Sequence, residues 1–445
     1  MDKMRATVFS VIAVAIVVGA SISLNYVTLD SGTFSPLPAN RTGVIPVQDN
    51  GNNNTTNTVS NGGTDGTFTV LPSENLPEIS DSRLKVEKVI EGLDLPTSMT
   101  FIGLDDILIL EKESGAVRLV SNGQLQEEPV LELAVESDSE RGLLGIAVQD
   151  NNVNGTKTVF LYFTQASGDE VRNRVYKYDL DESGNLSGET LVLDLPGEPG
   201  PNHDGGKLTI GPDGMLYAVI GDLNRNGVLQ NYVDGDKPDD TSVILRVDGN
   251  GNAAAGNPMP GELAKYYAYG IRNSFGIDFD PLTGVLWDTE NGPTGYDEIN
   301  VVKPGLNSGW EQTMGPIERS GKTVADLVQF EGSHYADPVF SWSQAHGITD
   351  IEFLNSTKLG TEYAYNIFVG DFNNGNLYFF TVNEARDGLE LGGPGLEDLV
   401  ADDSEEEEAI IFGTGFGAIS DIETGPDGYL YILTYDGDLY RIVPA

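Results

Sequence analysis

The chain has 445 residues, with 25 lysines and arginines against 69 aspartates and glutamates, so its formal net charge is −44 at pH 7. This acidity argues against a nucleic-acid-binding protein and against binding to an anionic membrane surface, because both need a basic footprint. The chain has no cysteine, which excludes a disulfide framework, a thiol nucleophile and a thiolate metal site.

Residues 1–29 predict a signal peptide or a membrane anchor. Lys3 and Arg5 precede an uncharged stretch, residues 6–29, with the apolar centre VFSVIAVAIVV. Its length approaches the ~20 residues of a membrane-spanning helix. A small-residue cleavage site, VGA, follows the apolar centre, so both alternatives stay open. In either case we expect the rest of the chain to be exported, to the cell surface or the extracellular space.

Residues 30–80 are rich in Gly, Asn, Thr, Ser and Pro, as in VQDNGNNNTTNTVSNGGTDG. Such a segment buries too little apolar surface to offset the entropy lost on ordering, so we predict a flexible linker. Residues 81–445 are long enough for a sizeable core and too continuous in pattern to divide, which predicts one domain.

From residue 84 onward, short runs of Val, Ile, Leu, Tyr and Phe alternate with turns of Asp, Gly, Asn and Pro, which is typical of an all-β chain. One unit recurs about six times: a strand, a turn and a second strand, as in GPDGMLYAV, DPLTGVLWDT, DFNNGNLYFF and GPDGYLYIL. Sheets repeated around a centre protect their edges, so we predict a six-bladed β-propeller. The final GDLYRIVPA would close it by pairing with RLKVEKVI, and a β-sandwich, the structural alternative, rarely needs so many residues.

Residues 202–222, NHDGGKLTIGPDGMLYAVIGD, predict a β-hairpin with its turn at residues 211–214. The numbers of paired residues in an antiparallel hairpin sum to a constant, here 425, and His203 and Asp222 give the same sum. The imidazole and the carboxylate should therefore meet at the end away from the turn, within one residue. Such a carboxylate can fix the tautomer of a histidine base. The alternative is a loop histidine that only caps a strand.

Residues 271–300, IRNSFGIDFDPLTGVLWDTENGPTGYDEIN, predict a second hairpin, in which Arg272 faces Gly292. If the blades are radial and share one polarity, both hairpins open onto the same face of the propeller. A histidine, an arginine and a glycine-rich loop would then surround one channel mouth. The alternative for Arg272 is a structural ion pair, because guanidinium groups commonly connect neighbouring blades.

The loop of this second hairpin offers oxygen ligands. The backbone carbonyls of the tight loop at Gly292 and Pro293, with the carboxylates of Asp297 and Glu298 close behind, have a spacing suited to calcium. The alternative is that the two carboxylates cap strands in an acidic protein.

These motifs resemble the soluble quinoprotein glucose and sorbosone dehydrogenases, or aldose sugar dehydrogenases, which are six-bladed propellers that use pyrroloquinoline quinone (PQQ) and calcium. The resemblance covers almost all of residues 84–445 in order, through GLDLPTSMTF, ERGLLGIAV, HDGGKLTIGPDGMLYAVIGD, the second hairpin, GLNSGW and GPDGYLYIL. It implies an oxidoreductase that transfers a hydride from an aldose or related sugar alcohol to PQQ and passes electrons to an external acceptor.

The resemblance also implies roles for the residues of both hairpins. His203 would take the proton of the sugar hydroxyl while hydride passes from the anomeric carbon to the quinone, with Asp222 as its carboxylate partner. Arg272 would polarise the quinone carbonyl that receives the hydride, and Asn273 would contact the cofactor.

The remaining implied contacts are with calcium and with the plane of the cofactor. The carbonyls of Gly292 and Pro293 would hold the calcium that bridges to the cofactor. Glu140 stands where some members have a glutamine that touches the cofactor. Trp310 and Trp342 could stack on a planar ring, although buried core aromatics are commoner in propellers.

The sequence departs from the family where characterised members meet the three carboxylates of the cofactor with lysine and arginine. Those places hold Asn373, Ala418 and Ser420. We expect the trianion to be bound less well, with compensation from calcium, the site arginine and either Arg141 or Lys207.

Two other functions stay open. A calcium-dependent hydrolase of the lactonase type would use His203 to activate water, and it would need calcium deep in the central tunnel, held by several side-chain oxygens. A non-catalytic binding or adhesion propeller that has lost the cofactor is favoured by the missing cations and disfavoured by the presence of His203, Asp222 and Arg272 together.

Overall fold

The computed structural model describes residues 68–445 except 74, 151–155, 169, 226–230 and 236. The predicted signal or anchor and most of the predicted linker lie outside the described residues. Within the part of the chain that is described, no helix is long and apolar enough to cross a membrane.

The described residues form six β-sheets of four to six strands. The first contains β3 (Pro96–Phe101), β4 (Ile107–Glu111), β5 (Ala116–Ser121), β6 (Gln124–Leu125) and β7 (Leu131–Glu132). The second contains β8 (Leu143–Asp150), β9 (Lys157–Ser167), β10 (Glu170–Leu180) and β11 (Leu186–Pro196). The third contains β12 (Leu208–Ile210), β13 (Leu216–Ile220), β14 (Val243–Val247), β15 (Tyr266–Tyr269), β19 (Leu306–Asn307) and β20 (His334–Tyr335).

The other three sheets follow in chain order. The fourth contains β16 (Gly276–Phe279), β17 (Leu286–Glu290), β18 (Asp297–Val302), β21 (Phe340–Trp342) and β26 (Val400–Ala401). The fifth contains β22 (Ile348–Phe353), β23 (Ile367–Asp371), β24 (Leu377–Val382), β25 (Leu389–Glu390), β27 (Ile411–Thr414) and β1 (Glu78–Ile79). The sixth contains β28 (Ile419–Thr424), β29 (Leu430–Thr434), β30 (Leu439–Pro444) and β2 (Leu84–Ile90).

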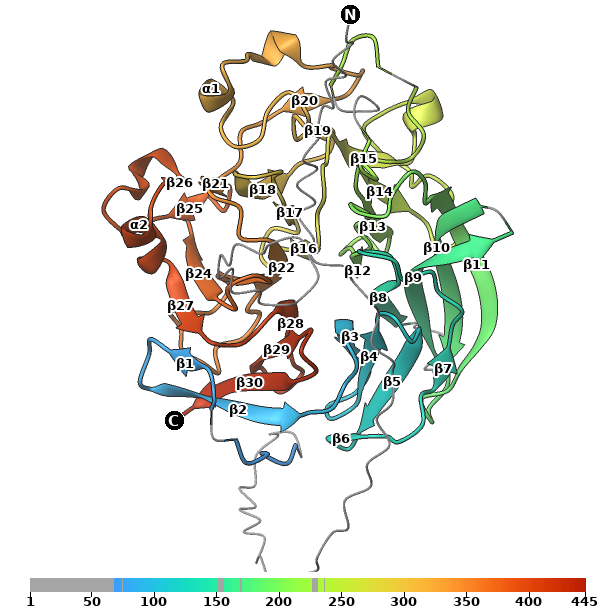
Figure 1. Ribbon diagram of the computed structural model, residues 1–445, viewed down its shortest axis with the longest axis vertical. Helices are drawn as coiled ribbons and strands as arrows, with labels where there is room; N and C mark the ends of the chain where they lie inside the picture. The colour runs from blue at the N-terminus through green and yellow to red at the C-terminus, as the bar shows by residue number, and fades with distance from the viewer. Residues whose placement is uncertain (1–67, 74, 151–155, 169, 226–230, 236) are drawn as a thin grey trace, which may run out of the picture. The chain divides into compact units, whose positions relative to one another are not determined.

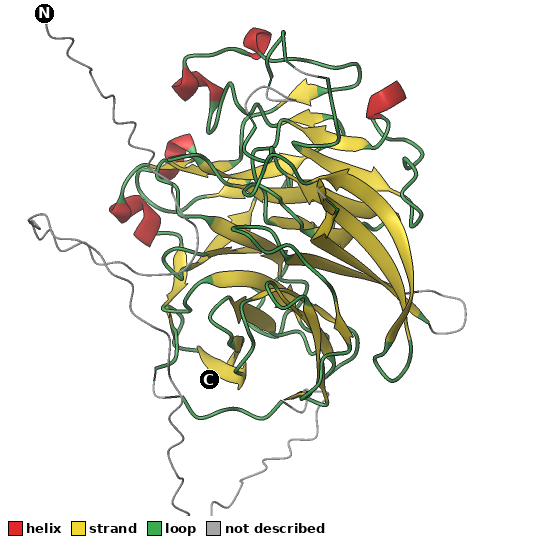
Figure 2. Ribbon diagram, turned by 45° about the vertical axis from the view of Figure 1, so that its right-hand side comes forward, coloured by secondary structure: helices red, strands yellow, loops and turns green. Residues whose placement is uncertain are grey.

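Helices are short and lie in the connections between strands (Figure 2). They are η1 (Gly261–Leu263), α1 (Ile317–Ser320), η2 (Val324–Asp326), η3 (Leu396–Asp398) and α2 (Ser404–Glu408).

The innermost strands of the six sheets surround a common centre (Figure 1). In the order β3, β8, β12, β16, β22 and β28, each of these strands contacts the next, and β28 contacts β3. The ring of sheets is closed by the two ends of the described chain, because β2 pairs with β30 through Leu84 opposite Pro444 and Val86 opposite Ile442. The predictions of an all-β propeller and of this terminal pairing are therefore confirmed.

The fold begins earlier in the chain than residue 81. Phe68 is 6% exposed and packs in an apolar cluster with residues of the first and sixth sheets. Strand β1 pairs with β27, through Glu78 opposite Thr414. Residues 68–73 and 75–80 therefore include segments of the propeller, although the linker was predicted to extend to residue 80. Single apolar residues such as Phe68 are enough to hold this polar segment against the sheets.

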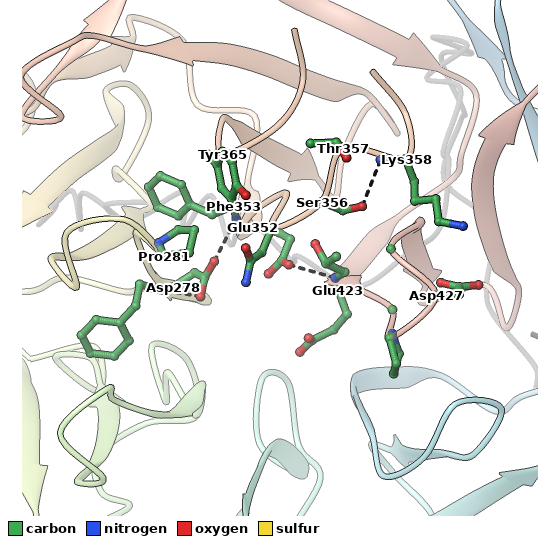
Figure 3. A pocket seen from close by; sticks show the side chains of 16 residues that line it. Asp278, Pro281, Glu352, Phe353, Ser356, Thr357, Lys358, Tyr365, Glu423 and Asp427 are labelled. Carbon is green, nitrogen blue, oxygen red and sulfur yellow. Dashed lines mark hydrogen bonds between the residues drawn. The ribbon is translucent and has the colours of Figure 1, made fainter. Parts of the chain in front are cut away.

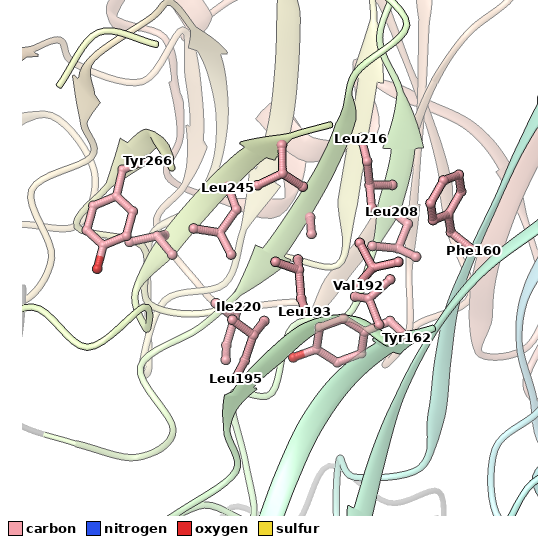
Figure 4. Packing of buried hydrophobic residues seen from close by; sticks show 14 of the residues in the cluster. Phe160, Tyr162, Val192, Leu193, Leu195, Leu208, Leu216, Ile220, Leu245 and Tyr266 are labelled. Atoms are coloured by element: carbon pink, nitrogen blue, oxygen red, sulfur yellow. The ribbon is translucent and has the colours of Figure 1, made fainter. Parts of the chain in front are cut away.

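Apolar side chains fill the spaces between neighbouring sheets. Between the second and third sheets, residues such as Tyr162, Leu195, Leu216 and Ile220 pack together (Figure 4). Strand β13 is buried along its whole length, because alternate residues face the two neighbouring sheets. This explains why its sequence, LYAVI, is continuously apolar and does not alternate with polar residues.

Candidate active site

The first predicted hairpin is present, with a β-bulge. Strands β12 and β13 pair Leu208 with Ala218, which gives a sum of 426, one more than predicted. Towards the open end, the N–H of Val219 donates to the carbonyl of Lys207 at 3.1 Å, and its carbonyl accepts the N–H of Gly206 at 3.0 Å. Two residues oppose one there, which is a bulge, and the register returns to the predicted sum.

His203 and Asp222 meet at the open end of this hairpin. Nδ1 of His203 lies 2.5 Å from Oδ1 of Asp222, and the two residues are 9% and 1% exposed. The backbone N–H of Asn224 also donates to Oδ1, and Nε1 of Trp310 donates to Oδ2 at 2.8 Å. A carboxylate that accepts these bonds keeps the proton of His203 on Nδ1. Nε2 is then the nitrogen that can accept a proton.

The two predicted hairpins are joined directly. The backbone N–H of Asp222 donates to the carbonyl of Arg272 at 2.9 Å. Gly221 lies where the two chains cross: a Cβ at this position would be 2.5 Å from the carbonyl oxygens of both His203 and Arg272. Only glycine allows this approach, which holds the loop that carries His203 against the loop that carries Arg272.

Arg272 is held by backbone groups and by an aromatic ring. The backbone N–H of Arg272 donates to Oε1 of Glu290 at 2.7 Å. The guanidinium Nη1 donates to the carbonyl of Asn291 at 2.8 Å. The guanidinium lies 5.4 Å from the centre of the Trp310 ring. Burial lowers the pKa of Arg272, opposed by the nearby carboxylates, of which Asp222 contributes most. The group is a buried cation without a direct carboxylate partner among the described salt bridges.

Glu140 connects the histidine loop with Asn273. Oε2 of Glu140 accepts the backbone N–H of His203 at 2.7 Å and Nδ2 of Asn273 at 2.9 Å. Glu140, which stands where the resemblance places a glutamine, therefore fixes two residues of the site.

These groups line one cavity of about 710 Å³. Its wall contains His203, Arg272, Asn273, Glu140, Gly292 and Pro293. The volume lies in the range of small-molecule sites. The structure thus brings both predicted hairpin ends to one cavity.

The side chains of Asp297 and Glu298 do not face the same site. They are neighbours on β18, so their side chains point to opposite faces of the sheet. Asp297 lines the cavity, but its carboxylate accepts three backbone N–H groups, those of Gly292, His346 and Gly347, at 2.7–2.9 Å. Burial raises its pKa, although these bonds oppose the rise.

Glu298 faces away from the cavity and accepts the N–H of Gly315. A calcium site that uses both carboxylates is therefore wrong, and Asp297 instead shapes the loop at Gly292. Across the described ranges, no group of three or more His, Asp or Glu side chains has the geometry of a metal site.

Trp342 is not brought to the cavity. It is fully buried on β21 and packs against Phe340, Tyr378 and Phe380, with ring centres 4.8–5.8 Å apart. The prediction that it contacts a cofactor is corrected: β21 is buried on both faces, so its aromatic residues form core.

Lys207 and Arg141, which were predicted to compensate for the missing cofactor-binding cations, already bind other groups of the protein. Nζ of Lys207 lines the cavity but donates to Asp350 at 2.8 Å and Asp421 at 2.5 Å. Burial lowers the pKa of Lys207, but these two carboxylates outweigh it and raise that pKa well above its ordinary value. Arg141 donates to the carbonyls of Gly197 and Pro199.

Lys112 is a cavity residue that the sequence did not indicate. It lies in the turn after β4, is 7% exposed, and donates from Nζ to the carbonyl of Ser137 at 3.2 Å. Burial lowers its pKa. Asn373 and Ser420 also line the cavity, whereas Ala418 is not among the described lining residues.

A second cavity, of about 750 Å³, lies at the other ends of β16, β22 and β28 (Figure 3). Asp278, Glu352 and Glu423 line it. Burial raises the pKa of Asp278 to about 6 and of Glu423 to about 8, and it raises that of Glu352 as well. Three acids that share one small space at the propeller centre are therefore protonated more readily than in water.

The chain is an all-β propeller with one cavity that collects a histidine–carboxylate couple and an arginine. The family model described as Glucose / Sorbosone dehydrogenase matches residues 93–441. The chain therefore belongs to the glucose/sorbosone dehydrogenase family, as its motifs predicted.

The chain is also similar to individual dehydrogenases. The chain is 26% identical over 370 residues to the aldose sugar dehydrogenase YliI of Escherichia coli (strain K12), covering 81% of this chain and 93% of that protein. It is 28% identical over 299 residues to quinoprotein glucose dehydrogenase B of Acinetobacter calcoaceticus, covering 59% and 60%. Among solved structures, the oxidoreductase (glucose dehydrogenase) of Thermus thermophilus superposes with a TM-score of 0.65 at 27% identity, covering 81% of this chain and 100% of that one.

The PQQ-bound aldose sugar dehydrogenase of Streptomyces coelicolor has the same fold. It superposes with a TM-score of 0.61 at 24% identity, covering 82% of this chain and 99% of that one.

Proposed function

We propose that this protein is an exported, calcium- and PQQ-dependent dehydrogenase that oxidises an aldose or a related sugar alcohol and passes the electrons to an external acceptor. Each of the six sheets would be one blade of a six-bladed propeller. The observation that carries the proposal is the meeting of the His203–Asp222 couple with Arg272 in one cavity. The names of the Escherichia coli and Acinetobacter relatives support the reaction class.

The residues of the cavity fit an anionic cofactor, with fewer cations than the motifs of the family would require. Arg272 and Lys112 supply positive charge, while Asn373 and Ser420 supply neutral polar groups. Oδ1 of Asn273 and Nε of Arg272 are buried polar atoms without a partner among the described residues, so polar groups remain for a ligand. The carbonyls of Gly292 and Pro293 are the groups that would hold calcium.

The mechanism follows from the hydrogen bonds of the site. Nε2 of His203 takes the proton of the substrate hydroxyl, because Nδ1 is held as a donor to Asp222. Asp222 stabilises the imidazolium that forms. Arg272 provides a fixed positive charge in a cavity of low dielectric constant, where it stabilises negative charge that develops on an oxygen. PQQ, when bound, supplies the acceptor for the hydride.

A lactonase-type activity lacks support from the centre of the ring. Such an enzyme would need a metal ion between side-chain oxygens in the tunnel. There the ammonium of Lys207 already lies between Asp350 and Asp421. A cation built into the chain thus occupies the position between these carboxylates that a metal ion would need.

A binding propeller without cofactor is the second candidate function. The neutral residues Asn373 and Ser420 in the cavity wall favour it. The chain is also 29% identical over 181 residues to human Hedgehog-interacting protein, which covers 37% of this chain and 25% of that protein. The intact His203–Asp222 couple favours the enzyme.

The test uses the full-length protein with calcium and PQQ. We expect binding of PQQ at micromolar concentration by calorimetry, and reduction of an electron-accepting dye with a panel of aldoses. His203→Ala should abolish dye reduction, while His334→Ala, on a strand outside the cavity, should leave it unchanged. Failure to bind PQQ would favour the binding propeller. Lactone hydrolysis without PQQ that a chelator abolishes would favour the hydrolase.

The proposed export is tested by measuring whether the protein is inside or outside the cytoplasm. We expect it outside the cytoplasm, either released or held by residues 1–29. Deletion of those residues should retain it inside the cell, and intracellular full-length protein would contradict the proposal.

A further inference from the structure

Trp310 is fixed between the two halves of the candidate site. It is 8% exposed and follows β19. Its backbone N–H donates to the carbonyl of Gly270 at 3.1 Å, and its carbonyl accepts Nδ2 of Asn231 at 2.7 Å. Both backbone groups are bonded, so the backbone that carries the indole is fixed by the surrounding chain.

The indole contacts both functional groups of the site. Nε1 donates to Oδ2 of Asp222 at 2.8 Å, in a buried bond between residues 88 apart in the chain. The guanidinium of Arg272 lies over the ring at 5.4 Å. A hydrogen bond to a carboxylate is stronger than one between neutral groups, and a cation over an aromatic face is attracted to it.

The other two tryptophans show that this bond is not a general feature of buried indoles here. Trp287 and Trp342 are fully buried in apolar clusters, and neither Nε1 has a hydrogen-bond partner among the described residues. The chain has three tryptophans. The one at the site is the one whose N–H is directed at a carboxylate.

The consequence concerns the two oxygens of Asp222. Oδ1 accepts Nδ1 of His203 and the N–H of Asn224, while Oδ2 accepts the indole. Without the indole N–H, Oδ2 of Asp222 becomes a buried acceptor that has lost this donor. The carboxylate can then rotate to another orientation. The imidazole then loses the fixed acceptor that keeps its proton on Nδ1.

We propose that Trp310 is a positioning residue of this site, which holds the Asp222 carboxylate through its N–H and supports Arg272 through its ring. The inference rests on the proposed role of His203 as the base. The indole couples the imidazole–carboxylate pair to the guanidinium, so that both face the same substrate.

The test separates the N–H from the ring. Trp310→Phe keeps an aromatic face for Arg272 and removes the donor together with the second ring. Trp342→Phe is the matched control, because that indole N–H has no partner. If Trp310→Phe does not fold, β-(3-benzothienyl)alanine at position 310 keeps the two-ring shape and lacks only the N–H. Thermal unfolding by circular dichroism verifies that each variant is folded.

The decisive measurement needs neither cofactor nor substrate. The chain has three histidines, so ¹⁵N-histidine labelling of the full-length protein gives three ring systems, and His203→Ala assigns the relevant one. We expect His203 to carry its proton on Nδ1 in the wild type and in Trp342→Phe, and to show a mixture of tautomers in Trp310→Phe. An unchanged tautomer in folded Trp310→Phe would overturn the proposal.

Turnover provides the second readout. With PQQ and calcium, Trp310→Phe should lower kcat about tenfold to a hundredfold, the loss expected when a charge-assisted bond is removed, with KM changed less than about twofold. An equal rise in KM with unchanged kcat would contradict a role in positioning the base. If the wild type shows no turnover, the proposed function fails, but the tautomer comparison still decides the role of Trp310.

Discussion

The acids of the second cavity should make the protein less stable as the pH rises, and Glu423 is the best place to test this. Burial raises the pKa of Glu423 to about 8, with the charge of Asp421 adding to the effect. In the unfolded chain the group should titrate near 4.5, its ordinary value. The native state therefore binds more protons than the unfolded state between these values, and the free energy of unfolding falls as the pH increases.

The magnitude follows from the two values. At pH 7 the group is ionised in the unfolded chain and protonated in the native protein, a difference of about two and a half pH units. Each unit corresponds to about 1.4 kcal/mol, so the native state loses about 3 kcal/mol of stability at pH 7. Glu423→Gln mimics the protonated acid in both states. It should raise the free energy of unfolding by about 3 kcal/mol at pH 7 and change it little at pH 4.

Urea denaturation followed by tryptophan fluorescence at the two pH values measures this difference. Glu182→Gln, at an exposed position, is the matched control and should have no effect at either pH. If Glu423→Gln destabilises the protein at pH 7, or stabilises it equally at pH 4, burial is not what raises the pKa of Glu423.

Three further substitutions test the first cavity. Lys207→Met leaves two buried carboxylates without their cation and should lower the free energy of unfolding by about 3–5 kcal/mol, measured by urea denaturation at pH 7. Glu140→Gln removes one negative charge from the wall and should tighten PQQ binding about fivefold by calorimetry, while an unchanged affinity would show that this charge does not oppose the ligand. Gly221→Ala places a Cβ 2.5 Å from the carbonyls of His203 and Arg272 and should lower kcat more than tenfold, so wild-type turnover would contradict the importance of this crossing.

The parts of the site that could be predicted from the sequence are those set by local chain geometry. His203 and Asp222 are 19 residues apart on one hairpin, and the sum rule placed them together. The bulge at Gly206 and Lys207, opposite Val219, shifts the register by one residue, which the prediction allowed. The prediction that Asp297 and Glu298 bind one calcium ion was wrong because neighbouring side chains on a strand point to opposite faces. This alternation could have been applied to the sequence itself.

The parts that could not be predicted are contacts between residues far apart in the sequence. Lys207 meets Asp350 and Asp421 at separations of 143 and 214 residues, and no local pattern indicates such partners. Trp310 was visible within the GLNSGW motif, but its bond to Asp222 joins residues 88 apart in the chain and depends on β19 lying beside β15 in the third sheet. Lys112 belongs to a turn with no special composition, and only the closed ring brings it to the cavity.

The distribution of cations decides how the first cavity can hold an anion. Lys207 lies in the cavity wall, yet its charge is cancelled by two carboxylates, and it serves to hold the inner strands of the third, fifth and sixth sheets together. A ligand with several negative charges must then rely on Arg272, on Lys112 and on a bound divalent cation. Because burial lowers the pKa of both Arg272 and Lys112, each gains electrostatic stabilisation when an anion enters. Buried carboxylates such as Glu140 and Asp297 also line this cavity, so an anion would depend on these few cations to offset them.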